Sequence, residues 1–237
     1  MNLSQIDISS AHLDFMQDKR VRLARFLRED SAAILHSLCK TKTPYQTNYV
    51  LENEYKILTE DDIANLSALQ QAEMTNSVIE QASQGVGFIY QSYMNSKINA
   101  ANVYKDKTLA PLHDAFEFMS SDDIISIFRE ITGDNTITGC DSHFTRFLPG
   151  HFLTRHQDEV STKKRKYAFV LSLTEHWHPD WGGLLQFYEK NGTPRDSWSP
   201  AFNTLSLFDI SYIHSVTFIT PFAKQPRLSL TGWFTSD

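Results

Sequence analysis

The sequence has few cysteines and no long apolar run. Its two cysteines, Cys39 and Cys140, are too few and too far apart for a disulfide framework, so a reducing compartment is the simplest environment. No stretch approaches the ~18 uninterrupted apolar residues that a membrane-spanning helix needs. The first ten residues, MNLSQIDISS, lack the basic and apolar regions of a secretory signal. These absences predict a soluble, cytoplasmic protein without a membrane partner.

An excess of positive charge is also missing. The chain of 237 residues carries 28 acidic and 22 basic side chains, a net charge of −6 at pH 7, so no global basic field attracts nucleic acid. A content of 41% hydrophobic and 21% charged residues is typical of a folded globular protein. No internal repeat or low-complexity linker is visible. We therefore expect one domain over residues 1–237.

The two halves of the chain have different patterns. Residues 1–134 are predicted to be rich in helices, and residues 135–237 to form the catalytic core from short strands. The helices are predicted to begin at Asp30 or Ser31, at Thr59 with a capping box to Asp62, at Leu112, and at Asp122 with Ser121 as cap. Strands in the first half are predicted at 21–27, 45–51 and 88–93.

Short strands and turn residues dominate the second half. Strands are predicted at 136–147, 167–173, 184–188, 204–208, 212–217 and 226–234, with turns that include 179–183 and 191–194. Many short strands separated in this way indicate a sandwich or a jelly roll. Helices followed by a sheet favour a single α+β domain.

A His-x-Asp pair lies in this predicted core. If residues 156–158 are extended, His156 and Asp158 project from the same face of the strand. His214 follows several strands later, and a rolled sheet brings a late strand opposite an early one. Two histidines and one carboxylate on one face of a metal, with the other positions open, are typical of non-haem Fe(II) oxygenases. The pattern predicts a metal site formed by these three residues.

A second pair indicates an anion site. Arg227 lies 13 positions after His214, and Arg227 and Ser229 share one face of a predicted strand. A guanidinium binds a carboxylate through two parallel hydrogen bonds, and a neighbouring hydroxyl adds a third. This pair suits the far carboxylate of 2-oxoglutarate, whose 2-oxo acid end would chelate the iron.

Several segments resemble the prolyl 4-hydroxylase-like family of Fe(II)- and 2-oxoglutarate-dependent oxygenases. Residues 147–158 (FLPGHFLTRHQD) look like the first metal motif of that family, and residues 181–188 (WGGLLQFY) resemble its glycine turn and the strand after it. Residues 199–208 (SPAFNTLSLF), His214 and residues 227–234 (RLSLTGWF) resemble the rest of the core. The likeness extends to the catalytic domain of the eukaryotic ribosomal-protein prolyl hydroxylases.

The resemblance implies a fold, cofactors and a reaction. The fold is a double-stranded β-helix, a jelly-roll core with flanking N-terminal helices. The catalytic metal Fe(II) is bound by His156, Asp158 and His214, and 2-oxoglutarate by Arg227 and Ser229. The reaction consumes O2, often with ascorbate, and releases succinate and CO2. It hydroxylates an unactivated C–H bond, here a prolyl residue of a protein or peptide substrate.

The sequence departs from the family pattern at several positions. Family members often carry tyrosine where this chain has Phe147 or Phe152, and again where it has Ser172. These phenols commonly contact the co-substrate. The eukaryotic relatives also carry a second, degenerate domain, for which this chain is too short.

Two other groups of residues allow different interpretations. His176 and His178 form a rival pair of ligands, but they lie beside Pro179 in a predicted turn, which favours a lid or surface role. The basic run at 163–166 is typical of a solvated loop. Because the run follows the metal motif, a role in contacting substrate stays open.

Three alternative functions stay open. The first is the same chemistry on a free amino acid or another small-molecule substrate. The second is a cupin-like metal enzyme that uses no 2-oxoglutarate, which Arg227 and Ser229 disfavour. The third is a non-catalytic sensor or peptide-binding module, which the intact set of iron ligands disfavours.

Overall fold

The computed structural model describes residues 1–100, 106–159 and 164–236. Its helices are α1 (Ile8–Asp18), α2 (Glu29–Thr41), α3 (Glu60–Ala64), α4 (Ala68–Ser83), α5 (Asn95–Ala100), α6 (Ala110–Met119) and α7 (Asp122–Thr132). Its strands are β1 (Arg20–Ala24), β2 (Gln46–Leu51), β3 (Glu54–Leu58), β4 (Phe88–Tyr93), β5 (Gly139–Phe147), β6 (Phe152–His156), β7 (Arg165–Ser172), β8 (Leu185–Tyr188), β9 (Pro194–Trp198), β10 (Thr204–Asp209), β11 (Ile213–Val216) and β12 (Arg227–Thr235).

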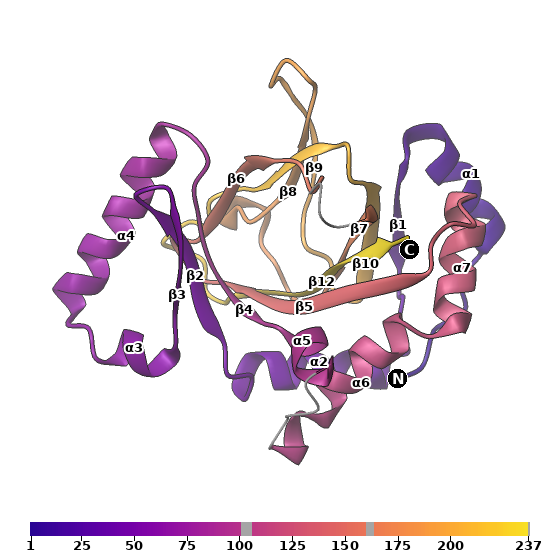
Figure 1. Ribbon diagram of the computed structural model, residues 1–237, viewed down its shortest axis with the longest axis horizontal. Coiled ribbons are helices and arrows are strands. Elements are labelled where there is room, and N and C mark those ends of the chain that lie inside the picture. Colours follow the sequence, from indigo (N-terminus) through magenta and orange to yellow (C-terminus); the bar gives the residue numbers. More distant parts are fainter. Residues whose placement is uncertain (101–105, 160–163, 237) are drawn as a thin grey trace.

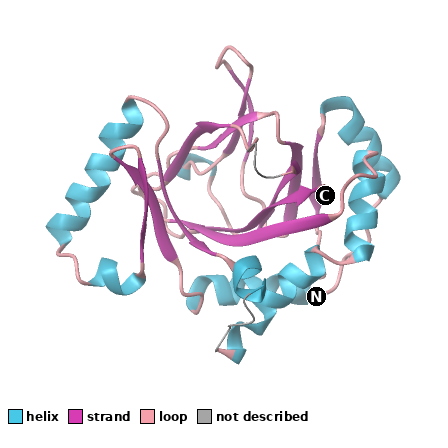
Figure 2. Cartoon of the chain, in the orientation of Figure 1, coloured by secondary structure: helices cyan, strands magenta, loops and turns pink. Residues whose placement is uncertain are grey.

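The strands form one curled antiparallel sheet (Figures 1 and 2). Within the described residues, the strand order is β1-β10-β7-β12-β5-β4-β6-β11-β8-β9, and β2 pairs with both β3 and β4. One wall consists of β1, β10, β7, β12 and β5, and the other consists of β6, β11, β8 and β9. Strand β4 joins them, because it pairs with both β5 and β6. The predicted α+β jelly roll is confirmed.

Helices cover the outer face of the wall that contains β5, β12 and β7. In Figure 1, α1 and α7 lie at one end of this wall, and α2, α5 and α6 lie beneath it. The main core between helices and sheet contains the fully buried rings of Phe128, Phe144, Phe169 and Phe234. The helix α7 contributes Phe128, whose ring centroid lies 4.3 Å from that of Phe234 on β12. The wall is therefore supported from outside, and its inner face is left for a cavity.

The predicted helix caps are confirmed with one correction. Thr59 and Asp62 form the expected capping box, and the Ser121 side chain caps α7. The helix α2 begins two or three residues earlier than predicted, because Arg28 is its N-cap. Asp30 and Ser31 therefore lie inside its first turn, where the Asp30 carboxylate accepts a hydrogen bond from the Ser31 N–H and its charge suits the helix dipole.

The elements that were not predicted include α1, β3, α5 and β9. The signal for α1 was present, because Asp7 accepts a hydrogen bond from the Ser10 N–H and the helix buries Ala11 and Phe15. The turn predicted at 191–194 is shorter, since Pro194 already belongs to β9. That strand is almost entirely exposed, so it shows no alternation of apolar and polar residues.

Truncation of Phe234 to alanine is expected to destabilise the protein by about 3–5 kcal/mol, because it leaves a cavity beside Phe128 and Phe169. Urea unfolding of Phe234→Ala measures this loss. The matched control is Leu13→Ala, at a side chain that is 64% exposed, where we expect a change within about 0.5 kcal/mol. Equal stabilities of the two variants would contradict the proposed core.

Candidate functional site

The strand β6 delivers His156, and the chain directly after it delivers Asp158. The strand ends at His156, so Asp158 is not on an extended strand as predicted. The two side chains nevertheless point to the same place, with His156 Nε2 3.8 Å from Asp158 Oδ1. Asp158 is buried. The loop after β6 therefore brings these two side chains together.

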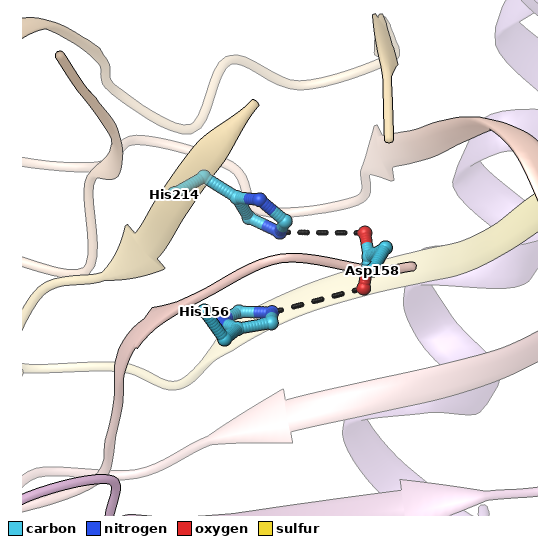
Figure 3. A group of neighbouring side chains, drawn as sticks. All are labelled: His156, Asp158 and His214. Carbon is cyan, nitrogen blue, oxygen red and sulfur yellow. Dashed lines mark ion pairs between the residues drawn. The ribbon is translucent and has the colours of Figure 1, made fainter. Parts of the chain in front are cut away.

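The third predicted residue reaches the same point from β11. The strands β11 and β6 are antiparallel neighbours, with His214 directly opposite His156 and their ring centroids 4.2 Å apart. His214 Nε2 lies 3.5 Å from Asp158 Oδ2. Figure 3 shows the carboxylate facing both imidazoles, with one oxygen toward each. One possible ligand atom from each residue lies within 4.8 Å of the others.

Backbone carbonyls orient both imidazoles. His156 Nδ1 donates to the carbonyl of Thr154 (2.9 Å), and His214 Nδ1 donates to the carbonyl of Tyr212 (3.0 Å). A carbonyl only accepts, so each Nδ1 carries the proton and each Nε2 presents a lone pair. The two lone pairs and the carboxylate oxygens converge, an arrangement that suits a divalent cation.

Burial favours the neutral form of His214. Burial, and then the charge of His156, lower the pKa of His214 to about 4. Metal ligation requires a neutral imidazole, so His214 is ready to bind a metal at neutral pH. Among the described residues, these three are the one group of His, Cys, Asp or Glu side chains that could hold a metal. The rival pair His176 and His178 is not part of it.

Next to the three residues lies a cavity of about 220 Å³ between the two walls. The Arg227 guanidinium lines it, 4% exposed, with Nη1 donating to Ser229 Oγ (3.2 Å). Burial lowers the pKa of Arg227 to about 10. Within the described residues, its buried Nε has no hydrogen-bond partner and no carboxylate forms an ion pair with it. A buried cation without a counter-charge calls for an anionic ligand.

The glycine turn before β8 packs close to this arginine. Gly182 has a φ of +70°, and a Cβ there would clash with the carbonyl oxygen of Phe218. A Cβ at Gly183 would lie 3.2 Å from the Arg227 side chain. Both positions therefore favour glycine, and the turn packs against the Arg227 side chain.

Three side chains near the cavity were not predicted as site residues. The Tyr90 ring on β4 lines the cavity and stacks on Phe147, with centroids 5.3 Å apart. Trp233 on β12 also lines it, and the guanidinium carbon of Arg165 lies 3.3 Å from the Trp233 ring centroid. They were missed because an aromatic residue in a predicted strand indicates a core position, and because Arg165 was assigned to a charged loop.

The residues of the basic run at 163–166 do not all lie in one loop. Lys163 lies outside the described residues. Arg165 begins β7 and donates from Nη1 to the backbone carbonyl of Asp158 (3.5 Å). This contact places one residue of the run beside the three grouped side chains rather than in a solvated loop.

The sequence comparisons agree with this geometry. Residues 142–235 match the 2OG-Fe(II) oxygenase superfamily. A segment of 86 residues is 36% identical to prolyl 3-hydroxylase OGFOD1 of Xenopus laevis, covering 33% of this chain and 16% of that protein. The mouse protein is 34% identical over 86 residues, covering 33% and 15%. The chain thus matches only about a sixth of the length of these relatives. The predicted resemblance to the 2OG-Fe(II) oxygenases and to prolyl hydroxylases is confirmed over this part of the chain.

Solved structures share the fold. A Pseudomonas putida prolyl 4-hydroxylase superposes with a TM-score of 0.60 at 20% identity, over 97% of this chain and 99% of that one. A Trichoplax adhaerens prolyl hydroxylase, solved with a hypoxia inducible factor peptide, gives a TM-score of 0.62 at 14% identity, over 97% and 89%. In the described part of the chain, no helix is long and apolar enough to span a membrane.

The metal-free protein is expected to lose stability between pH 7 and pH 5. Burial, and then the charge of Arg146, lowers the pKa of His151 from 6.5 to about 4. Between these values the unfolded chain binds more protons, so this stabilisation is complete above the unfolded pKa and is lost as the pH falls through the folded pKa. Urea unfolding at both pH values measures the loss. In His151→Gln we expect a smaller difference, and a difference as large as in the wild type would contradict this origin.

Proposed function

Because residues 142–235 of this chain match the 2OG-Fe(II) oxygenase superfamily, we propose that the protein is an Fe(II)- and 2-oxoglutarate-dependent dioxygenase that hydroxylates an unactivated C–H bond. The observation that carries the proposal is the position of the unpaired Arg227 guanidinium in the same cavity as His156, Asp158 and His214. One cavity thus offers a set of metal ligands and a binding site for an anion.

The three grouped side chains would hold the metal. The two Nε2 lone pairs and the Asp158 carboxylate supply two neutral ligands and one anionic ligand, the facial set that suits Fe(II) and leaves other positions open. With 2-oxoglutarate and O2 bound, the iron supplies the oxidising chemistry: one oxygen atom enters the substrate C–H bond, and the other enters the succinate that forms as CO2 leaves. The family implies these cofactors, and ascorbate is proposed as the reductant that keeps the iron in its divalent state.

Arg227 and Ser229 would bind the co-substrate. The guanidinium is buried and lacks a counter-charge, so the far carboxylate of 2-oxoglutarate would supply one and accept paired hydrogen bonds from it. The Ser229 hydroxyl already accepts from Arg227 Nη1 and is free to donate its own proton to the carboxylate. Arg227 and Ser229 would thereby position 2-oxoglutarate in the cavity.

The proposed substrate is a prolyl residue of a protein or peptide. The relatives that support it are named prolyl hydroxylases, of the 3-type and of the 4-type, so both ring positions are open here. A second pocket of about 350 Å³ shares Tyr90, His143 and Trp233 with the central cavity. This second pocket would give room for residues next to the proline, which supports a polypeptide substrate.

The two cysteines bear on the compartment. Both are free thiols, and burial raises the pKa of Cys39 to about 12, so that thiol is inert. We propose a cytoplasmic location, where thiols stay reduced.

The first test is anaerobic titration with Fe(II) and 2-oxoglutarate, followed by the weak visible charge-transfer band of an iron-bound 2-oxo acid. The wild type and Arg28→Ala, a matched control at an exposed arginine, are expected to develop the band. His156→Ala is expected to lose it. In Arg227→Gln the band is expected to need about 10- to 100-fold more 2-oxoglutarate, since charge-assisted hydrogen bonds are lost from a buried site.

Absence of the charge-transfer band would indicate a different class of reaction. A wild-type protein that binds Fe(II) normally but develops no band would overturn the oxygenase proposal and favour a cupin-like metal enzyme.

The substrate class is tested by succinate formation. We expect prolyl peptides to raise succinate release well above the uncoupled rate, and free L-proline to leave it unchanged. Stimulation by free L-proline alone would instead favour the small-molecule alternative, and a band without stimulation by either would favour a different substrate class.

A further inference from the structure

Arg20 is a buried cation that lies outside the matched family region, at the start of β1. It is 6% exposed and donates from Nη1 to Asp196 Oδ1 (2.7 Å) and from Nε to Asp18 Oδ2 (3.0 Å). A buried charge is costly unless it is paired and fully hydrogen-bonded. Two carboxylates from distant parts of the chain satisfy this requirement here.

Aromatic rings surround the same guanidinium. Its central carbon lies 4.3 Å from the ring centroid of Phe187, 5.1 Å from that of Tyr212 and 5.2 Å from that of Trp198. Guanidinium groups at such distances are attracted to the ring faces. Arg20 therefore holds rings from β8, from β9 and from the turn before β11 against β1.

A second arginine closes the network. Arg195 donates to Asp18 Oδ1 (2.6 Å) and to the Tyr212 hydroxyl (3.1 Å), and that hydroxyl donates to the backbone carbonyl of Asp18 (2.7 Å). Burial acts to raise the pKa of Asp18, but these hydrogen bonds and those from Arg20 lower it overall. The five residues Asp18, Arg20, Arg195, Asp196 and Tyr212 are called the Arg20 clamp below.

The Arg20 clamp ends at the proposed metal ligand His214. The backbone carbonyl of Tyr212 accepts the hydrogen bond from His214 Nδ1. Phe187, which lies under Arg20, has its ring centroid 6.5 Å from the imidazole. The clamp therefore holds both the hydrogen-bond acceptor and a ring beside His214. In contrast, His156 is oriented by Thr154 of its own strand.

We propose that the Arg20 clamp positions His214 for metal binding, so that Asp18 and Arg20 of the N-terminal segment act on the metal site through Tyr212. This inference rests on the proposed metal-binding function. The clamp fixes the turn at Tyr212 in space, the fixed carbonyl keeps the proton on Nδ1, and Nε2 then faces Asp158. When the clamp is loosened, the fold persists, but the imidazole can rotate and also populates the tautomer that is protonated on Nε2.

Tyr212→Phe is the variant that tests the Arg20 clamp, because it removes the hydroxyl and keeps both the ring and the backbone carbonyl. Loss of a direct partner of a metal-ligating histidine typically weakens metal binding 10- to 100-fold. Tyr212 acts through its backbone, so we expect about three- to tenfold weaker binding of Co(II), titrated by its visible absorption. Asp18→Asn is expected to act in the same direction.

Tyr167→Phe is the matched control. It removes a tyrosine hydroxyl that donates to Asp134 (3.1 Å) and has no contact with His214, so its Co(II) affinity is expected to equal that of the wild type. Urea unfolding of all metal-free variants compares their losses of stability. Wild-type Co(II) affinity in both Tyr212→Phe and Asp18→Asn would overturn the proposal.

A readout without metal separates this inference from the proposed function. Nitrogen chemical shifts of the His214 ring report its tautomer in the metal-free protein. We expect one Nδ1-protonated tautomer in the wild type and in Tyr167→Phe, and a mixture in Tyr212→Phe. If the wild type binds no Co(II), the proposed function fails while the shifts still decide whether the Arg20 clamp orients His214. A single tautomer in Tyr212→Phe as well would overturn the clamp's role.

Discussion

The antiparallel pairing of β6 with β11 is the contact on which the rest of the site depends. It sets His214 directly opposite His156, and Asp158 then reaches both rings from the loop after β6. Grouping two lone pairs and a carboxylate is unfavourable without a cation, because like partial charges face each other. The sheet pairing and the backbone carbonyls behind the rings hold this grouping in place.

The N-terminal half contributes directly to the site as well as to the core. Strand β4 lies between β5 and β6, so it completes the sheet that encloses the cavity and places Tyr90 on Phe147. Strand β1 pairs with β10 and carries Arg20. The family match begins only at residue 142, so these strands add walls and support that the matched segment does not supply.

Local patterns predicted most elements and the grouping of the key side chains. The alternation along a strand placed Arg227 and Ser229 on one face, and their hydrogen bond bears this out. The same rule predicted that Asp158 lies beside His156, which the structure shows. The reason was wrong, because Asp158 follows the end of the strand. Tyr90 and Arg165 could not be identified, since their role depends on which strands become neighbours. Strand β9 was missed because an exposed strand has no apolar alternation.

The pairing of β1 with β10 also determines the order of folding. Arg20 lies opposite Phe208, so the two paired strands are far apart in the sequence. During synthesis β1 leaves the ribosome long before its neighbour exists, and contacts between such distant segments form slowly. The Arg20 guanidinium stays hydrated until Asp196 and the rings of β8 and β9 arrive. Closure of the jelly roll is therefore a late step of folding, and until then β1 is an unpaired strand edge that is prone to aggregation.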